Sequence, residues 1–111
     1  ISEETAEMVN ATHRNGKKVF AVGITVMRAL ETPVTTQAEI KPYSGWTNKF
    51  IFPPYNFSIA DAFITNFHLP SSTMLMSAAA FGGFEKVMNA YDVALKEGYK
   101  FGTYGDAMLI I

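Results

Sequence analysis

The first part of the chain alternates between an amphipathic stretch and a short apolar run. Ser2 precedes two glutamates and apolar side chains at helical spacing, which predicts a helix capped by Ser2 and ended by Asn15-Gly16. Residues 18–22 are mostly apolar and predict a buried strand. Gly23 then permits a turn into a second predicted helix over 25–31. We therefore expect a strand, a turn and a helix in succession.

The middle of the chain has no helical period. Pro33 ends the second helix, and residues 32–45 carry proline, threonine and serine without regular spacing, so they predict a loop. Residues 50–52 are apolar and stop at two prolines, which predicts a short strand. Residues 62–65 predict another strand, which ends at the polar Asn66.

Two helices and a strand are predicted in the last part of the chain. Ser71 is a favourable N-cap for a helix that ends at Gly82-Gly83, and Gly98 closes the next helix. Residues 99–101 predict a final strand before a turn. Because strands alternate with helices, the expected fold class is α/β, with helices layered on both faces of one sheet over residues 1–111. The second of these helices has the clearest apolar stripe of the chain: Phe84, Val87, Met88, Tyr91 and Leu95.

Composition narrows the class of protein. Nine lysines and arginines against ten aspartates and glutamates leave a net charge of −1, whereas a free-standing nucleic-acid module usually carries a basic surplus. The absence of cysteine excludes disulfides and cysteine nucleophiles and fits a cytoplasmic protein. No stretch approaches the roughly 18 uncharged apolar residues of a membrane-spanning helix, so we expect a soluble protein. The chain begins at Ile1 without an apolar leader, and we interpret it as a fragment.

The densest polar cluster, residues 65–73, lies between a predicted strand and a predicted helix. Ligands of α/β sheets bind beyond the carboxyl ends of the strands, where helix N-termini offer free N–H groups. Ser71, Ser72 and Thr73 are therefore candidates for holding a carboxylate or phosphate, although serine and threonine at a helix start are more often ordinary caps. His68 titrates near neutrality and is a candidate acid or base, although a lone histidine is often structural.

Other positions carry candidate chemistry with an open alternative. Asp106 follows Gly105, so its carboxylate is suited to a ribose-like diol or to the turn itself. Arg28 lies three residues from Glu31 and either pairs with it or binds an anion. No second histidine or cysteine stands at ligand spacing from His68, so no metal site is expected. One aromatic group offers either core packing or a stacking surface for a base: Trp46, Phe50, Phe52, Tyr55 and Phe57.

Four segments together resemble one family. Residues 21–32, 45–55, 61–76 and 104–110 are similar, in that order, to segments of the S-adenosylmethionine:tRNA ribosyltransferase-isomerases of queuosine biosynthesis. The most specific is the Thr-Asn-Phe-His-Leu-Pro-Ser-Ser-Thr run of residues 65–73. The sequence departs from the family pattern at Ile24, where threonine is more usual, and at Gly102-Thr103, where an aromatic residue and serine are more usual.

The resemblance implies that the chain is the C-terminal portion of the α/β domain of a longer enzyme, whose separate β-barrel domain is absent. It also implies transfer and isomerisation of the ribosyl group of S-adenosylmethionine onto 7-aminomethyl-7-deazaguanine in tRNA, which gives epoxyqueuosine. S-adenosylmethionine is then a co-substrate, and neither a metal nor another cofactor is implied. The implied partners are that tRNA and the remainder of the enzyme chain.

Carried onto the matching positions, the resemblance implies catalytic roles for His68 and Asp106. A non-catalytic nucleotide-binding module stays open as an alternative; it would hold a phosphate at the 71–73 helix start, although the chain lacks a glycine-rich phosphate loop. A purely structural or oligomerisation segment is a third interpretation. The implied substrate-binding residues, all within the matched segments, are Thr25, Arg28, Asn66, Ser71, Ser72, Thr73, Tyr104 and Gly105.

Overall fold

Local signals set both ends of the first helix. In the computed structural model, which describes residues 1–70 and 72–111, α1 spans Glu3–Arg14. Ser2 is its N-cap, and the Ser2 Oγ accepts a hydrogen bond from the Thr5 N–H at 3.1 Å. Gly16 follows with a positive φ of 68°, a conformation that suits glycine and turns the chain out of the helix. The predicted first helix is confirmed.

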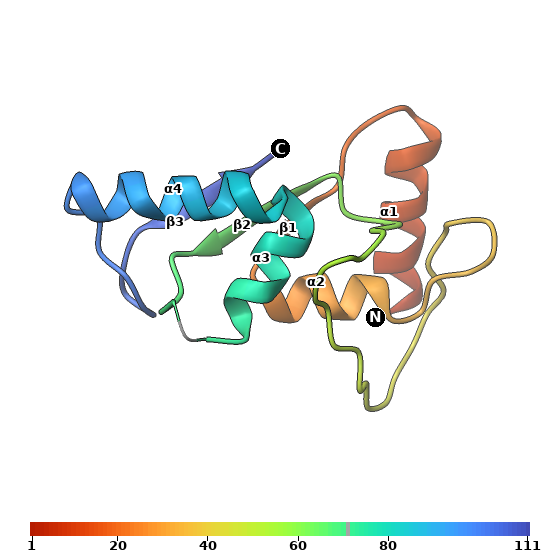
Figure 1. The fold of residues 1–111 in the computed structure, drawn as a ribbon. Helices are drawn as coiled ribbons and strands as arrows, with labels where there is room; N and C mark the ends of the chain where they lie inside the picture. Colours follow the sequence, from red (N-terminus) through yellow and green to blue (C-terminus); the bar gives the residue numbers. More distant parts are fainter. Residues whose placement is uncertain (71) are drawn as a thin grey trace.

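The described residues form four helices and one three-stranded sheet (Figure 1). The helix α4 runs alongside β2 and β3, while α1 stands at the opposite end of the molecule (Figure 1). After α1, the elements in chain order are β1 (Phe20–Val22), α2 (Ile24–Glu31), β2 (Ala62–Asn66), α3 (Met74–Gly82), α4 (Phe84–Lys96) and β3 (Ala107–Ile110).

The sheet is mixed, with β2 in the centre. β1 pairs with β2 in parallel, with Phe20 opposite Ala62, while β3 pairs with β2 in the antiparallel direction. Asp61 joins the first two strands at their start, because its Oδ2 accepts a hydrogen bond from the Val19 N–H at 2.8 Å. The first strand begins at Phe20, two residues later than predicted.

The two faces of the sheet differ in burial. On one face Ala21, Phe63 and Met108 are buried in the core beneath the helices. On the other face Phe20 is 49% exposed and its neighbour Val22 is 59% exposed. The expectation of helices on both faces is therefore not met within residues 1–70 and 72–111; the α/β class is confirmed, but this sheet is open on one side.

Two predicted strands are wrong. Residues 50–52 follow an irregular path, and residues 99–101 lead into a turn, whereas the last strand, Ala107–Ile110, comes after that turn. Pairing decides the outcome, because a short apolar run becomes a strand only where a neighbour supplies hydrogen bonds. The run of 107–110 finds β2 across four residue pairs.

The two C-terminal helices are confirmed, with changes at their ends and faces. α3 begins at Met74 with Thr73 at the N-cap position; the predicted cap, Ser71, lies outside the described residues. The Met74 N–H instead donates to Ser72 Oγ at 3.1 Å. In α4 the predicted apolar stripe divides, because Val87 and Tyr91 are buried while Phe84 and Leu95, at its ends, are exposed.

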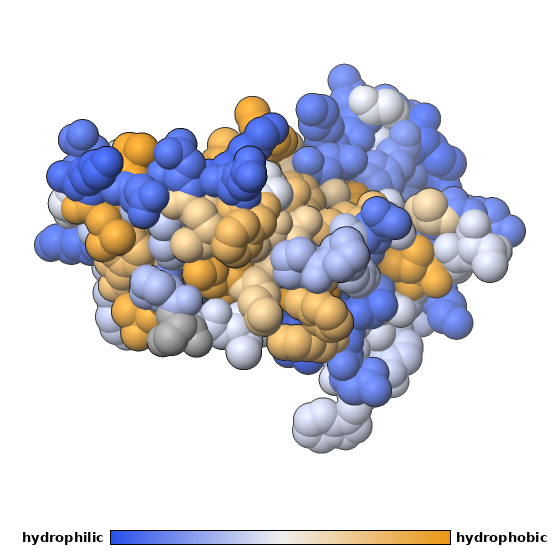
Figure 2. All heavy atoms as spheres, viewed as in Figure 1, coloured by the Kyte–Doolittle hydropathy of each residue, from blue (hydrophilic) through white to orange (hydrophobic). Residues whose placement is uncertain are grey.

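On the side of the molecule drawn in Figure 2, hydrophobic residues gather near the middle. In Figure 2 hydrophilic residues cover α1 and the outer side of α4, and hydrophobic residues gather over α3 between them. Met74 and Met76 on α3 and Phe84 beside it are all among the exposed large hydrophobic side chains.

Within the described part of the chain, no helix combines the length and the apolar character needed to cross a membrane.

Candidate functional site

A hollow of about 450 Å³ lies beyond the carboxyl end of β2. Its walls come from three segments: the residues that follow β2, the start of α3, and the loop between α4 and β3. This is the crevice position in which α/β sheets bind ligands. The lining residues are Asn66, His68, Leu69, Ser72, Met74, Gly102 and Thr103.

His68 is the titratable side chain of this hollow. Its Nε2 lies 2.8 Å from the Thr65 Oγ1, and its backbone N–H donates to the Tyr91 hydroxyl at 2.9 Å. Burial lowers the pKa of His68 below its ordinary value of 6.5, because a charged imidazolium is poorly solvated there. The neutral ring is therefore favoured at cellular pH.

Buried aromatic side chains hold the segment that carries His68. Phe67 packs against Tyr91 and Phe101, with ring centroids 5.2 and 5.3 Å away. Its backbone N–H donates to the Asp106 carbonyl at 3.1 Å, and its own carbonyl accepts the Gly102 N–H at 2.9 Å. The residues after β2 are thus fixed from α4 and from the last loop at the same time.

Asp106 is engaged in the turn that precedes β3. Its Oδ2 accepts the Lys100 N–H at 2.8 Å, and its N–H donates to the Lys100 carbonyl at 2.8 Å. A Cβ on Gly105 would lie 2.5 Å from that carbonyl oxygen, so glycine is required by close approach. The turn interpretation of Gly105 and Asp106 is what the geometry shows, and neither residue lines the hollow of His68. Tyr104, at the tip of the turn, is fully exposed.

Arg28 lies in a separate hollow of about 260 Å³ that it shares with Lys49, Thr73 and Met74. Its Nε donates to the Lys49 carbonyl at 2.9 Å. Of the two alternatives for Arg28, pairing with Glu31 is not seen among the described ion pairs: Glu31 is buried and accepts the Ser58 N–H at 2.7 Å. Met74 lines this hollow and that of His68, so the two adjoin at the start of α3.

The start of α3 offers fewer free N–H groups than the sequence predicts. The Met74 N–H donates to the Ser72 hydroxyl, the Leu75 N–H to the Ser72 carbonyl and the Met76 N–H to the Thr73 carbonyl. These contacts favour the capping interpretation over a phosphate site, and Ser71 is outside the described residues. They also weaken the case for a nucleotide-binding module that relies on this helix start. Thr25, on α2, is exposed and lines none of the hollows above.

The aromatic group of residues 46–57 separates into two parts. Tyr55 and Phe57 pack against the core, with Phe57 4.9 Å from Phe81. Trp46 is 97% exposed, and Phe50 and Phe52, 5.3 Å from each other, are about half exposed. Only the second part stays available for stacking on a ligand.

Several contacts of the site and of the sheet were not predicted from the sequence. Thr65 and Tyr91 were assigned to a strand and to a core stripe, and only the fold brings both to His68. The His13 Nε2, near the end of α1, lies 2.9 Å from the Asp61 Oδ2. Burial alone would raise the pKa of Asp61, but hydrogen bonds from the Val19 N–H and the His13 ring lower it overall. The one local indication of the contact between Thr65 and His68 was their spacing of three residues.

The fold and the site define a small α/β domain with an open crevice, built by a mixed sheet and the start of one helix, around a single neutral histidine. The chain belongs to the family of queuosine biosynthesis proteins, whose model matches residues 1–110. The resemblance recognised in the sequence is thereby confirmed.

Relatives match the chain over its whole length. It is 60% identical to the S-adenosylmethionine:tRNA ribosyltransferase-isomerase of Bacteroides fragilis and 57% identical to that of Parabacteroides distasonis. A crystal structure of S-adenosylmethionine tRNA ribosyltransferase from Thermotoga maritima matches all of the chain at 45% identity with a TM-score of 0.90. The chain covers 32% of each of the two curated relatives and 39% of the crystallised chain, so it spans about a third of their length.

Proposed function

We propose that these 111 residues form the C-terminal portion of the α/β domain of an S-adenosylmethionine:tRNA ribosyltransferase-isomerase. The reaction transfers the ribosyl group of S-adenosylmethionine to the aminomethyl group of 7-aminomethyl-7-deazaguanine in tRNA. Adenine and methionine leave, and the sugar rearranges to the epoxycyclopentanediol of epoxyqueuosine. The observation that carries the proposal is the 60% identity to a ribosyltransferase-isomerase over the entire chain.

His68 is the residue that we assign to the reacting atoms. It lines the crevice beyond β2, its ring is neutral, and two buried residues hold it in place. A histidine in this setting is suited to donate or accept a proton as the glycosidic bond breaks and the sugar rearranges. Asn66 and Ser72 line the same hollow and are assigned to polar contacts with the substrate.

Arg28 is assigned to the anionic end of a substrate, either the methionine carboxylate or a tRNA phosphate. Within the described residues its Nη1 and Nη2 atoms make no hydrogen bond, and Lys49 and Thr73 share its hollow. Asp106 holds its turn through Oδ2, and we assign the remaining oxygen, Oδ1, to the ribose diol. For Thr25, Ser71, Tyr104 and Gly105 the implied contact with substrate stays a prediction.

The remainder of a longer chain is the partner that we assign to the open face of the sheet. The relatives are about three times as long as this chain, and the face that carries Phe20, Val22 and Leu109 is apolar and about half exposed. Apolar surface of this kind marks a site where another segment packs. The proposed enzyme acts in the cytoplasm, where its tRNA substrate is found.

The proposal is tested on the full-length protein that contains this chain. Purified protein, S-adenosylmethionine and tRNA carrying the aminomethyl base should yield epoxyqueuosine, detected by mass spectrometry of the digested nucleosides. Replacing His68 with alanine should lower turnover by about a hundredfold, as expected for loss of a proton-transfer group. No product with wild-type protein, or tighter calorimetric binding of ATP than of S-adenosylmethionine, would contradict the assigned function.

A further inference from the structure

His68 is held at two points by buried residues of two different elements. Thr65, in β2, contacts the ring at Nε2, and Tyr91, in α4, accepts the backbone N–H. The exposed fractions of Thr65 and Tyr91 are 4% and 2%. Both the position of the backbone and the orientation of the ring are therefore set from inside the domain.

The burial of Thr65 favours its hydroxyl as the donor of this hydrogen bond. Within residues 1–70 and 72–111, the His68 Nε2 is the hydrogen-bond partner of the Thr65 hydroxyl, at 2.8 Å. A buried hydroxyl whose proton has no acceptor is destabilising, and the buried side-chain N and O atoms of the described residues all have partners. Donation from the Thr65 hydroxyl to Nε2 gives that proton an acceptor among the described residues, and it leaves the proton of the neutral ring on Nδ1.

We propose that Thr65 is a positioning residue that fixes His68 as the Nδ1–H tautomer, so that His68 meets the substrate as a hydrogen-bond donor and not as a base. The proposal rests on the assigned function, since that function places substrate in the hollow. It narrows the role of His68 from acid or base to donor.

The chemistry of the assigned reaction has a use for such a donor. Negative charge develops on the nitrogen of the departing adenine and on the ribose oxygen as bonds to the sugar break. A fixed N–H aimed at such an atom stabilises the transition state through a hydrogen bond, and no proton has to leave the ring. Because Nε2 is occupied by Thr65, Nδ1 is the nitrogen that can serve the substrate.

Two substitutions of His68 in the full-length enzyme separate donor from base. The amide nitrogen of asparagine stands at the same number of bonds from Cα as Nδ1, whereas that of glutamine stands where Nε2 does. His68→Asn keeps a donor at the Nδ1 position, and we expect about tenfold higher turnover than with His68→Gln. Neither amide is a base, so equal and complete loss in both variants would overturn the donor role.

Substitutions of Thr65 test the positioning role. Thr65→Val keeps the shape of the side chain and removes the hydroxyl; kcat should fall by about tenfold, with KM and the unfolding temperature nearly unchanged. Thr65→Ser should restore most of the turnover. In a His68→Ala background, Thr65→Val should have no further effect, because the two residues act as a unit. Additive losses would mean that Thr65 acts independently of His68.

The tautomer is measured without any reaction. In ¹⁵N-histidine-labelled full-length protein, the His68 ring should show a protonated Nδ1 and an unprotonated Nε2, and Thr65→Val should mix the two tautomers. A proton found on Nε2 would overturn the proposal whatever the enzyme's activity. If Nδ1–H is confirmed but the protein does not transfer a ribosyl group, the assigned function is contradicted, while the positioning of His68 by Thr65 is still supported.

Discussion

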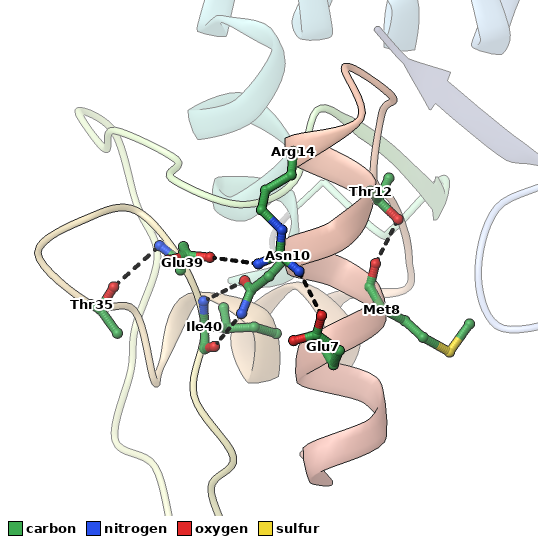
Figure 3. Close-up of polar contacts among 8 residues, drawn as sticks. All are labelled: Glu7, Met8, Asn10, Thr12, Arg14, Thr35, Glu39 and Ile40. Carbon is green, nitrogen blue, oxygen red and sulfur yellow. Dashed lines mark hydrogen bonds and ion pairs between the residues drawn. The ribbon is translucent and has the colours of Figure 1, made fainter.

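Asn10 fastens the long middle loop to α1, and its removal should destabilise the protein measurably. The Asn10 side chain donates to the Ile40 carbonyl at 2.8 Å and accepts the Ile40 N–H at 2.9 Å, so one amide satisfies both backbone groups of a buried residue (Figure 3). Arg14, one turn further along the helix, pairs with Glu7 and Glu39 at the surface (Figure 3). Exposed ion pairs of that kind contribute little to stability, so Asn10 makes the more important polar contact between α1 and this loop.

The magnitude follows from the two hydrogen bonds. Each contributes about 1 kcal/mol, and Asn10→Ala also leaves the buried N–H and carbonyl of Ile40 short of partners, so the total loss should be about 2–3 kcal/mol. The melting temperature should fall by about 4 °C for each kcal/mol. Alanine is the better helix former and offsets about 0.6 kcal/mol of the loss.

Asn89→Ala is the matched control. Asn89 lies in α4, is exposed and makes no hydrogen bond among the described residues, so this substitution has the same gain in helix propensity without the loss. Denaturant unfolding of wild type and both variants gives the difference directly, and hydrogen exchange at Ile40 locates it. If the unfolding free energies of Asn10→Ala and Asn89→Ala differ by less than about 0.5 kcal/mol, the usual error of such comparisons, the hydrogen bonds of Asn10 do not stabilise the protein.

Three further outcomes are expected. Burial raises the pKa of Glu31, which means that its ionised form is disfavoured in the folded protein. As pH rises from about 4.5 through this raised pKa, the wild type should therefore lose stability relative to Glu31→Gln. A difference in unfolding free energy between the two proteins that stays constant over that pH interval would contradict this. Gly105→Ala should cost about 1–3 kcal/mol in denaturant unfolding, since its Cβ would collide with the Lys100 carbonyl. The 111-residue chain alone should self-associate and should not modify tRNA, because the crevice and one sheet face are open; an active monomer in light scattering and product assays would refute that.

The sequence predicted those elements whose ends carry local chemistry. Ser2 and Gly16 bound α1, and the helical period sets α4, because caps and periodicity act within a few residues. The prediction was wrong for residues 50–52 and for the position of the last strand, because strand formation there depends on a pairing partner far away in the sequence. Apolar runs of three or four residues contain no information about which of them β2 will pair with.

The candidate site was predicted in position and only partly in its contacts. The polar cluster around His68 does line a crevice, because the strand-to-helix position was visible in the pattern. The contact of His68 with Tyr91 depends on the packing of α4 against the end of β2, which no local pattern encodes, whereas Thr65 stands only three residues before His68. Asp106 and Arg28 were predicted near the same chemistry, yet their hydrogen bonds join them to Lys100 and Lys49.

The direction of β3 determines which loop can reach the crevice. β3 runs antiparallel to β2, with Ala107 opposite Asn66, so the residues that enter β3 emerge beside the residues that leave β2. A parallel last strand would carry Gly102 and Thr103 to the opposite end of the sheet, and the crevice would lose one wall. The reversal of a single edge strand thus turns a connection between two elements into part of the binding surface. Changes in the length of that connection should alter ligand selectivity before they alter the fold.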